Sequence, residues 1–178
     1  MKPPHASIVL AAAAGLSSLA GCKPPPTDEA LLSEAPQPDR TFASEPLPSP
    51  ESEGAMWARS SRGPDRIVYG IPGQPALLAL SCDRGAGILT VTRISPADED
   101  ADAMLALIGN GHVGRLPVDA TGIGEDILWQ GSADAQSEQW EPLAGPRKLT
   151  ATIPGAGMVE INPSQLPMRL IESCRAES

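Results

Sequence analysis

Short runs in which apolar and polar residues alternate recur along the chain from about residue 66 onward. In residues 88–93, Leu89 and Val91 alternate with threonines, and residues 149–153 repeat this alternation. A period of two residues places one face of a strand against a core and the other toward solvent. Residues 76–82 are apolar on both faces, which predicts a central strand buried on both sides.

Further short strands are predicted between Gly, Pro, Asn or Asp residues, which commonly bound strands. They are residues 66–69, 104–108, 112–118, 126–130 and 158–161. The spacing favours an all-β fold, a small antiparallel sandwich or barrel. The end of the chain is ambiguous, because residues 163–166 could begin a short helix whereas residues 168–171 fit a last strand. We favour the strand.

The alternation is absent from residues 22–55, where prolines recur from Pro24 to Pro50 among Ser and Glu. Such a segment buries too little apolar surface to offset the entropy of ordering it, so a disordered, partly polyproline tether is expected. At about 3.1 Å per residue it could hold a domain up to about 100 Å from its anchor. The sequence therefore predicts a tether at 22–55 and a β domain at 56–178.

The first residues have the layout of an export signal. Lys2 precedes an apolar run of residues 6–16, which is too short to span a hydrocarbon core about 30 Å thick. The segment Leu19-Ala20-Gly21-Cys22 resembles the lipobox of bacterial lipoprotein precursors. This resemblance covers residues 1–22 and implies that residues 1–21 are a signal peptide, that Cys22 receives a diacylglycerol and that the chain is cut before it.

The lipoprotein resemblance also implies a location. Acyl chains on Cys22 would hold the protein on a membrane of the cell envelope without a transmembrane helix. The residue after the cysteine is Lys23, whereas aspartate is the usual signal for retention at the inner membrane. By this family analogy, the outer membrane facing the periplasm is favoured.

Charge narrows the choice of partners. Loss of Lys2 with the signal leaves 12 basic and 22 acidic side chains. This balance argues against nucleic acid, whose phosphates require a basic surface. It also leaves membrane binding to the acyl chains, because anionic lipid headgroups attract basic segments.

Cysteine pairing follows once Cys22 is assigned to lipid. Cys82 and Cys174 then remain, and an even pair in an exported chain is typical of a disulfide. Two free thiols or a metal pair are alternatives, but the domain has one histidine and no close cysteine spacing. We predict no metal site and no cofactor.

Candidate catalytic residues are scattered. Residues 109–114 match a dinucleotide fingerprint formally, but they lead into Pro117 rather than a helix, so a turn between strands is the better interpretation. A Ser-His device would have to use His112. Three acidic residues could supply the carboxylate pair of a glycosidase or simply solvate loops; they are Asp119, Glu125 and Asp126.

Two loops were considered as ligand sites. Residues 95–102 contain several aspartates but lack the glycine and the distal glutamate of a calcium-binding EF-hand loop, so a solvated hairpin tip is expected there. Residues 154–157 contain two glycines between predicted strands. They are expected to form a turn, with a ligand-contacting loop as the alternative.

One basic patch interrupts this acidic chain. Arg59, Arg62 and Arg66 lie close to Trp57 and are candidates for binding an anionic glycan or a carboxylate. The alternative is a solvated edge strand.

The sequence therefore favours a non-enzymatic, lipid-anchored binding or accessory module of the cell envelope, with an envelope protein or glycan as partner. Small acidic β-domain lipoproteins with one disulfide resemble the lysozyme-inhibitor lipoproteins, which makes an inhibitor of a basic muramidase the alternative. A hydrolase of envelope polymers, using His112 or a carboxylate pair, is the third hypothesis.

Overall fold

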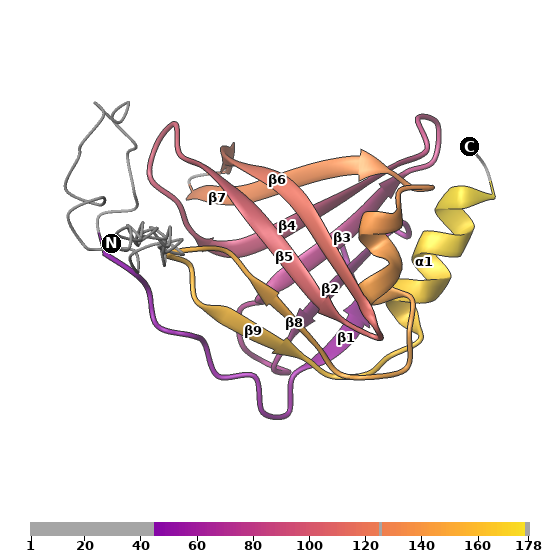
Figure 1. Cartoon of the computed structure of the whole chain (residues 1–178), viewed down its shortest axis with the longest axis horizontal. Coiled ribbons are helices and arrows are strands. Elements are labelled where there is room, and N and C mark those ends of the chain that lie inside the picture. The colour runs from indigo at the N-terminus through magenta and orange to yellow at the C-terminus, as the bar shows by residue number, and fades with distance from the viewer. Residues whose placement is uncertain (1–44, 125, 177–178) are drawn as a thin grey trace, which may run out of the picture. The chain divides into compact units, whose positions relative to one another are not determined.

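The computed structural model describes residues 45–124 and 126–176. The predicted signal peptide, Cys22 and the tether up to residue 44 lie outside the described residues. The domain contains nine strands and two helical segments, arranged in the chain order shown in Figure 1.

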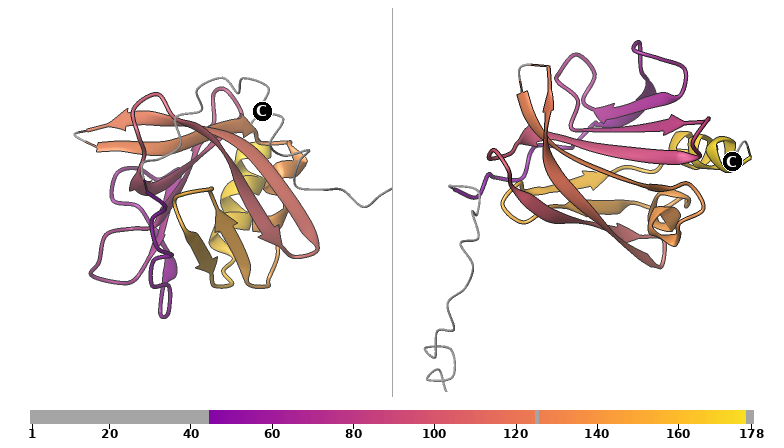
Figure 2. Two further views of the ribbon diagram at one scale, coloured as in Figure 1. Left: turned by 60° about the vertical axis from the view of Figure 1, so that its left-hand side comes forward. Right: turned by 90° about the horizontal axis from the view of Figure 1, so that it is seen from above.

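The strands form one antiparallel sheet in the order β1-β2-β3-β4-β7-β6-β5-β8-β9. Their bounds are Met56–Arg59 (β1), Arg66–Gly70 (β2), Leu78–Asp83 (β3), Ile88–Pro96 (β4), Asp102–Gly109 (β5), His112–Ile123 (β6), Asp126–Asp134 (β7), Leu149–Thr152 (β8) and Met158–Ile161 (β9). The all-β prediction is confirmed. Of the two predicted architectures the structure has the barrel, because the sheet curls until its first and last strands approach each other (Figure 2).

Side chains bridge the seam between the two sheet edges. The hydroxyl of Tyr69 on β2 donates to the carbonyl of Glu160 on β9 at 3.0 Å and accepts from the amide of Asn162 at 2.9 Å. The Asn162 amide side chain donates to the carbonyl of Ala55 at 2.9 Å. These bonds satisfy backbone groups that would otherwise be exposed at free edges.

The interior of the barrel holds the inward-facing residues of every strand. On β3 and β4, Leu78, Leu80, Leu89 and Val91 are buried, as the alternation predicts. Trp57 is also inside, with its ring 5.3 Å from that of Tyr69. Trp140 adds a large side chain from a 3-10 helix, η2 (Glu138–Leu143), which packs against β6 and β5.

The end of the chain differs from its prediction. Leu166–Arg175 is an α-helix, α1, rather than a last strand. The buried residues Pro167, Leu170, Ile171 and Cys174 recur at the three- and four-residue spacing of a helix face. The prediction was wrong because it weighed residues 168–171 in isolation, whereas the helical period is visible only over the longer window. No helix in the described part of the chain is long and apolar enough to cross a membrane.

The disulfide prediction is confirmed. Cys82 on β3 and Cys174 on α1 are joined, with their Cα atoms 5.9 Å apart. The bond ties the last helix to a central strand, and α1 packs against β3 more than against any other strand.

Two predicted turns are confirmed and one is wrong. Asn110 and Gly111 both have positive φ in the tight β5–β6 turn, and Gly155 and Gly157 have positive φ between β8 and β9. Residues 97–101 are not a hairpin tip, because β4 pairs with β7 and β5 pairs with β6. In the sheet, β7 and β6 lie between β4 and β5, so the connection from β4 to β5 is a crossover. Local composition does not reveal such a long-range connection.

The last part of the predicted tether contacts the domain. The amide of Leu47 donates to the carbonyl of Gly155 at 2.8 Å, and the Ser49 hydroxyl accepts from the amide of Met158 at 3.0 Å. Ala55 is buried. Residues 45–55 therefore run along the β9 side of the seam before β1 begins.

Candidate functional site

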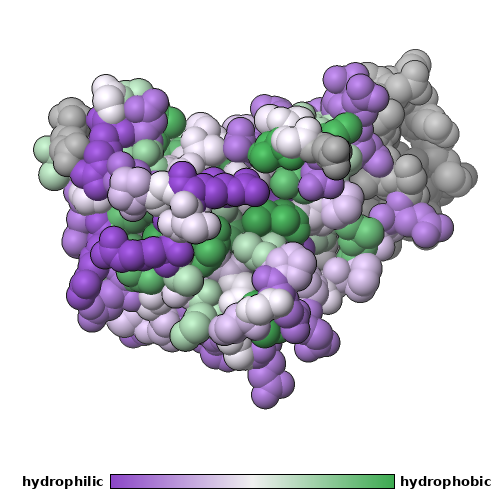
Figure 3. Space-filling model, turned by 180° about the vertical axis from the view of Figure 1, so that it is seen from behind, coloured by the Kyte–Doolittle hydropathy of each residue, from purple (hydrophilic) through white to green (hydrophobic). Residues whose placement is uncertain are grey.

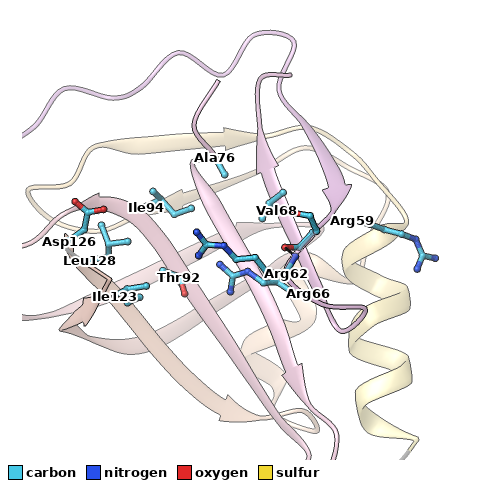
Figure 4. Close-up of a pocket in the computed structure, with 12 residues that line it drawn as sticks. Arg59, Arg62, Arg66, Val68, Ala76, Thr92, Ile94, Ile123, Asp126 and Leu128 are labelled. Atoms are coloured by element: carbon cyan, nitrogen blue, oxygen red, sulfur yellow. Dashed lines mark hydrogen bonds between the residues drawn. The ribbon is translucent and has the colours of Figure 1, made fainter. Parts of the chain in front are cut away.

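A groove of about 470 Å³ crosses the outer face of the barrel over β2, β3, β4 and β7 (Figure 4). It lies between the β1–β2 loop and the turn end of the β6–β7 hairpin. Figure 3 shows this side of the molecule, where apolar atoms are exposed beside strongly hydrophilic side chains. The lining residues are Arg59, Ser60, Ser61, Arg62, Arg66, Val68, Ala76, Thr92, Ile94, Ile123, Asp126 and Leu128.

The floor of the groove follows from strand register. Val68 pairs with Ala79, Ala79 with Thr92, and Thr92 with Gln130, so these four residues form one row on the outer face. Thr92 is only 2% exposed although it faces outward. Its hydroxyl accepts a hydrogen bond from the Gln130 side chain at 3.2 Å.

Apolar side chains make up most of the remaining floor. Ile94 lies two residues after Thr92 on β4, Val68 comes from β2, Leu128 from β7 and Ala76 from the segment between β2 and β3. Surface strands that face water usually carry polar residues at these positions. The groove is therefore an apolar surface on the side of the sheet opposite the core.

Arg62 and Arg66 extend over this floor. Figure 4 shows both guanidinium groups directed across β3 toward Thr92 and Ile94. Arg62 is held by the β1–β2 loop, where its backbone amide donates to the Ser60 hydroxyl at 3.1 Å. Arg66 begins β2 on its outward face, so strand pairing fixes the position of its backbone.

The environment of Arg66 disfavours its positive charge. Burial, and then the neighbouring charge of Arg62, lowers the pKa of Arg66. Its Nε atom is buried without a hydrogen-bond partner. In residues 45–124 and 126–176, neither Arg62 nor Arg66 makes an ion pair with a carboxylate. A bound anion would offset the repulsion between the two positive charges.

Asp126 gives the opposite end of the groove the opposite charge. It begins β7 and is exposed, and Figure 4 places it beyond Leu128, away from the two guanidinium groups. Asp126 pairs with Ile123 across the β6–β7 hairpin. The arrangement of basic end, apolar floor and acidic end can bind a ligand with a matching distribution of charge.

The predicted basic patch is only partly assembled. Arg62 and Arg66 share the groove, as the sequence predicted. Arg59 lies at the rim, with its side chain directed away from them toward α1 (Figure 4). Trp57 faces the core at 7% exposure and does not line the groove. In sequence, a tryptophan beside an arginine cluster resembles a binding residue. In the structure, Trp57 is a core residue because it lies on the inward face of β1.

Several groove residues were missed by the sequence analysis. Val68, Thr92, Ile94 and Leu128 were interpreted only as strand residues, because no local signal shows that an outward face is covered by a neighbouring loop. Asp126 was considered solely as half of a carboxylate pair. Its possible partner Asp119 lies on β6, where it pairs with Gln130 and not with Asp126. Glu125 lies outside the described residues.

Other candidate chemistry is not brought together. His112 is exposed at the start of β6, and within the described ranges its side chain makes no hydrogen bond to a serine or a carboxylate. No group of three or more His, Cys, Asp or Glu side chains that could hold a metal ion occurs among the residues that the structure describes.

Comparison with known proteins adds no family. No protein-family model, no curated protein and no solved structure matches this chain. The chemistry of the groove and the predicted export signal therefore provide the indications of function.

Proposed function

We propose that this protein is a lipid-anchored, non-enzymatic binding module of the cell envelope and that its domain binds an anionic ligand in the groove. The lipobox-like segment ending at Cys22 supports the anchor, and the proline-rich segment after it supports a domain held away from the membrane. Outer-membrane attachment facing the periplasm is part of this proposal and comes from Lys23 after the cysteine.

The observation that carries the proposal is the pair formed by Arg62 and the half-buried Arg66, which face the groove together and make no ion pair with a carboxylate among the described residues. Two other arginines of the described residues pair with acids: Arg84 with Asp65, and Arg175 with Glu141 at 2.8 Å. Arginines outside the groove that form no such ion pair are either exposed or, like Arg93, bonded to backbone carbonyls. The chain has 22 acidic residues, so carboxylates are plentiful. Two neighbouring arginines that face a groove without such a partner have the geometry of an anion site.

The nature of the groove favours binding over catalysis. Arginine stays protonated at neutral pH and is a poor general base, whereas its planar group recognises carboxylates in a bidentate manner. The hydrolase hypothesis would use His112, which does not line the groove. The muramidase-inhibitor hypothesis requires attraction to a basic protein, and a groove with two unpaired arginines repels one.

The test is a titration with sodium acetate, followed by NMR of the arginine Nε–H signals in a chain of residues 23–178. This chain retains all the residues that the structure describes. We expect saturable shifts at Arg62 and Arg66. Either Arg62→Gln or Arg66→Gln should weaken binding about tenfold, because charge-assisted hydrogen bonds contribute about 1.5–3 kcal/mol each.

Arg59→Gln is the matched control, since it removes one positive charge at the rim without removing a group that faces the floor. It should weaken acetate binding no more than about twofold, as expected for an exposed charge. Equal losses in all three variants would show a nonspecific charge effect and contradict the site. Linear, unsaturated shifts in the unaltered chain would also contradict it.

A further inference from the structure

The groove has a basic end and an acidic end, and this polarity narrows the class of ligand. Arg62 and Arg66 reach over the floor from the β2 side, and Asp126 stands at the β7 side (Figure 4). An inorganic anion would use only the basic end. A polyanionic glycan would bring negative charge close to Asp126, and the aliphatic tail of a fatty acid would meet that carboxylate with nothing to pair with it.

The dimensions of the groove indicate a short chain end. Its volume of about 470 Å³ is in the range of small-molecule sites. The strands β2 and β7 are separated by β3 and β4, so their axes are three strand spacings, or about 14 Å, apart. The arginine side chains cover part of this distance, and an extended peptide advances about 3.3 Å per residue. Two or three residues therefore separate groups bound at the two ends.

We propose that the groove binds the carboxyl-terminal end of a peptide whose last side chain is apolar and which carries a cationic side chain two or three residues earlier. The terminal carboxylate pairs with the guanidinium groups of Arg62 and Arg66. The apolar side chain covers Ile94 and Leu128. The cationic group lies beside Asp126.

This inference rests on the proposed function, because it takes the arginine pair as the anion site. It adds the identity of the anion, the apolar contact and the role of Asp126. A role for Asp126 distinguishes this peptide site from a simple anion site. Without a cationic group beside it, the Asp126 carboxylate would weaken the attraction of any anion to the groove.

Isothermal titration calorimetry of residues 23–178 with four probes tests the binding of a peptide carboxyl terminus. The probes are acetyl-Lys-Ala-Ala-Leu with a free carboxylate, the same peptide with a carboxyl-terminal amide, the free acid with norleucine in place of lysine, and octanoate. Amidation should weaken binding about tenfold or more in the unaltered chain. In the double variant Arg62→Gln, Arg66→Gln it should weaken binding less than about twofold, because both partners of the carboxylate have gone.

Norleucine tests the acidic end. Its replacement of lysine should weaken binding about two- to fivefold in the unaltered chain, as expected for an exposed ion pair. The same replacement should have no effect in Asp126→Asn. Asp119→Asn is the matched control, because this exposed acid also lies on the β6–β7 pair but does not line the groove, and it should preserve the preference for lysine. Thermal unfolding of each variant verifies its fold.

Each contrary result has a definite meaning. Equal binding of the acid and the amide overturns the role of the carboxylate. Equal binding of the lysine and norleucine peptides overturns the role of Asp126. Tighter binding of octanoate than of the peptide assigns the groove to acyl carboxylates and overturns the peptide. Acetate shifts at Arg62 and Arg66 without any peptide preference sink this inference alone, whereas the absence of acetate shifts sinks the proposed function.

Discussion

Arg93 is buried and Arg66 is half-buried, and their surroundings give them different roles. Arg93 is 5% exposed, and its guanidinium donates to the carbonyls of Leu77, Ile94 and Ala156 at 2.9–3.2 Å. Burial lowers the pKa of Arg93 to about 10. These backbone contacts fasten β3, β4 and the β8–β9 turn, so Arg93 is structural. Among the described residues, Arg66 has no such set of backbone acceptors, and it faces a groove. Its free donors and its position in the groove, rather than its burial, indicate a ligand-binding site.

Tyr69 offers the clearest prediction at the scale of a residue. Burial raises the pKa of its hydroxyl above the ordinary value of 10.0. The chain has one tyrosine, so tyrosinate absorbance reports Tyr69 alone. In the native protein this absorbance should rise at a higher pH than in the protein unfolded in urea.

The raised pKa of Tyr69 also sets a pH dependence of stability. Above pH 10 the unfolded chain releases this proton before the folded chain does, so the free energy of unfolding should fall as pH rises from 10 toward the folded pKa. Below pH 10 this group should have no effect. Urea unfolding at several pH values would measure it, and a native titration at or below pH 10 would contradict it.

Tyr69→Phe provides the matched variant for that measurement. It removes the hydroxyl that bridges Glu160 and Asn162 and leaves the Asn162 amide without its acceptor, so the free energy of unfolding should fall by about 1–3 kcal/mol at pH 7. The alkaline slope due to Tyr69 should disappear.

At the scale of elements, the helix α1 depends on its covalent link. It is ten residues long, and isolated helices of that length are marginal in water. Its stability therefore comes from the buried face that contacts β3 and from the bond between Cys82 and Cys174. The same face explains why a short apolar run near the end of the chain becomes helical rather than extended.

The double variant Cys82→Ser, Cys174→Ser should lower the free energy of unfolding by about 4 kcal/mol, because the bond closes a loop with a sequence separation of 92. Urea unfolding measures the loss. Hydrogen exchange should show that the amides of α1 lose protection before those of β3 and β4. Reduction of the unaltered chain with dithiothreitol is the control and should have the same effect. A loss below about 1 kcal/mol would show that packing alone holds the helix.

At the scale of the whole molecule, the barrel and the proposed anchor have separate tasks. The groove is on the outer face of β2, β3, β4 and β7, so the fold presents its ligand site to the outside rather than enclosing it. Residues 45–55 lead into β1 along the seam. Within the domain, the groove is built without any residue from that leading segment.

Location is predicted at this scale. Cells that produce the chain should contain it in the membrane fraction, with an N-terminal peptide that begins at Cys22 and carries acyl groups, since two or more chains are needed for stable anchoring. Mass spectrometry of that fraction measures it. Cys22→Ala should abolish the acylation and release the protein from the membrane, and the released protein should bind acetate as residues 23–178 do. An unacylated N-terminal peptide in the membrane fraction would contradict the lipoprotein assignment.

The sequence by itself determined the features that depend on local pattern. The alternation of Leu89 and Val91 with threonines located β4, and residues 109–114 indicated a turn between strands, since both rules act within a few residues. The pairing of Cys82 with Cys174 followed from counting cysteines in an exported chain.

Only the tertiary structure decided which of these local elements became neighbours. Arg66 and Asp126 lie on the same groove because β7 pairs with β4 instead of β5, and no nearby residue specifies that choice. Trp57 faces inward because the barrel closes over β1. Residues 166–175 form a helix because their buried face packs against β3. Side-chain burial is set by contacts between distant segments, so it divided the predicted arginine and tryptophan patch into a core residue, a rim residue and two residues that face the ligand groove.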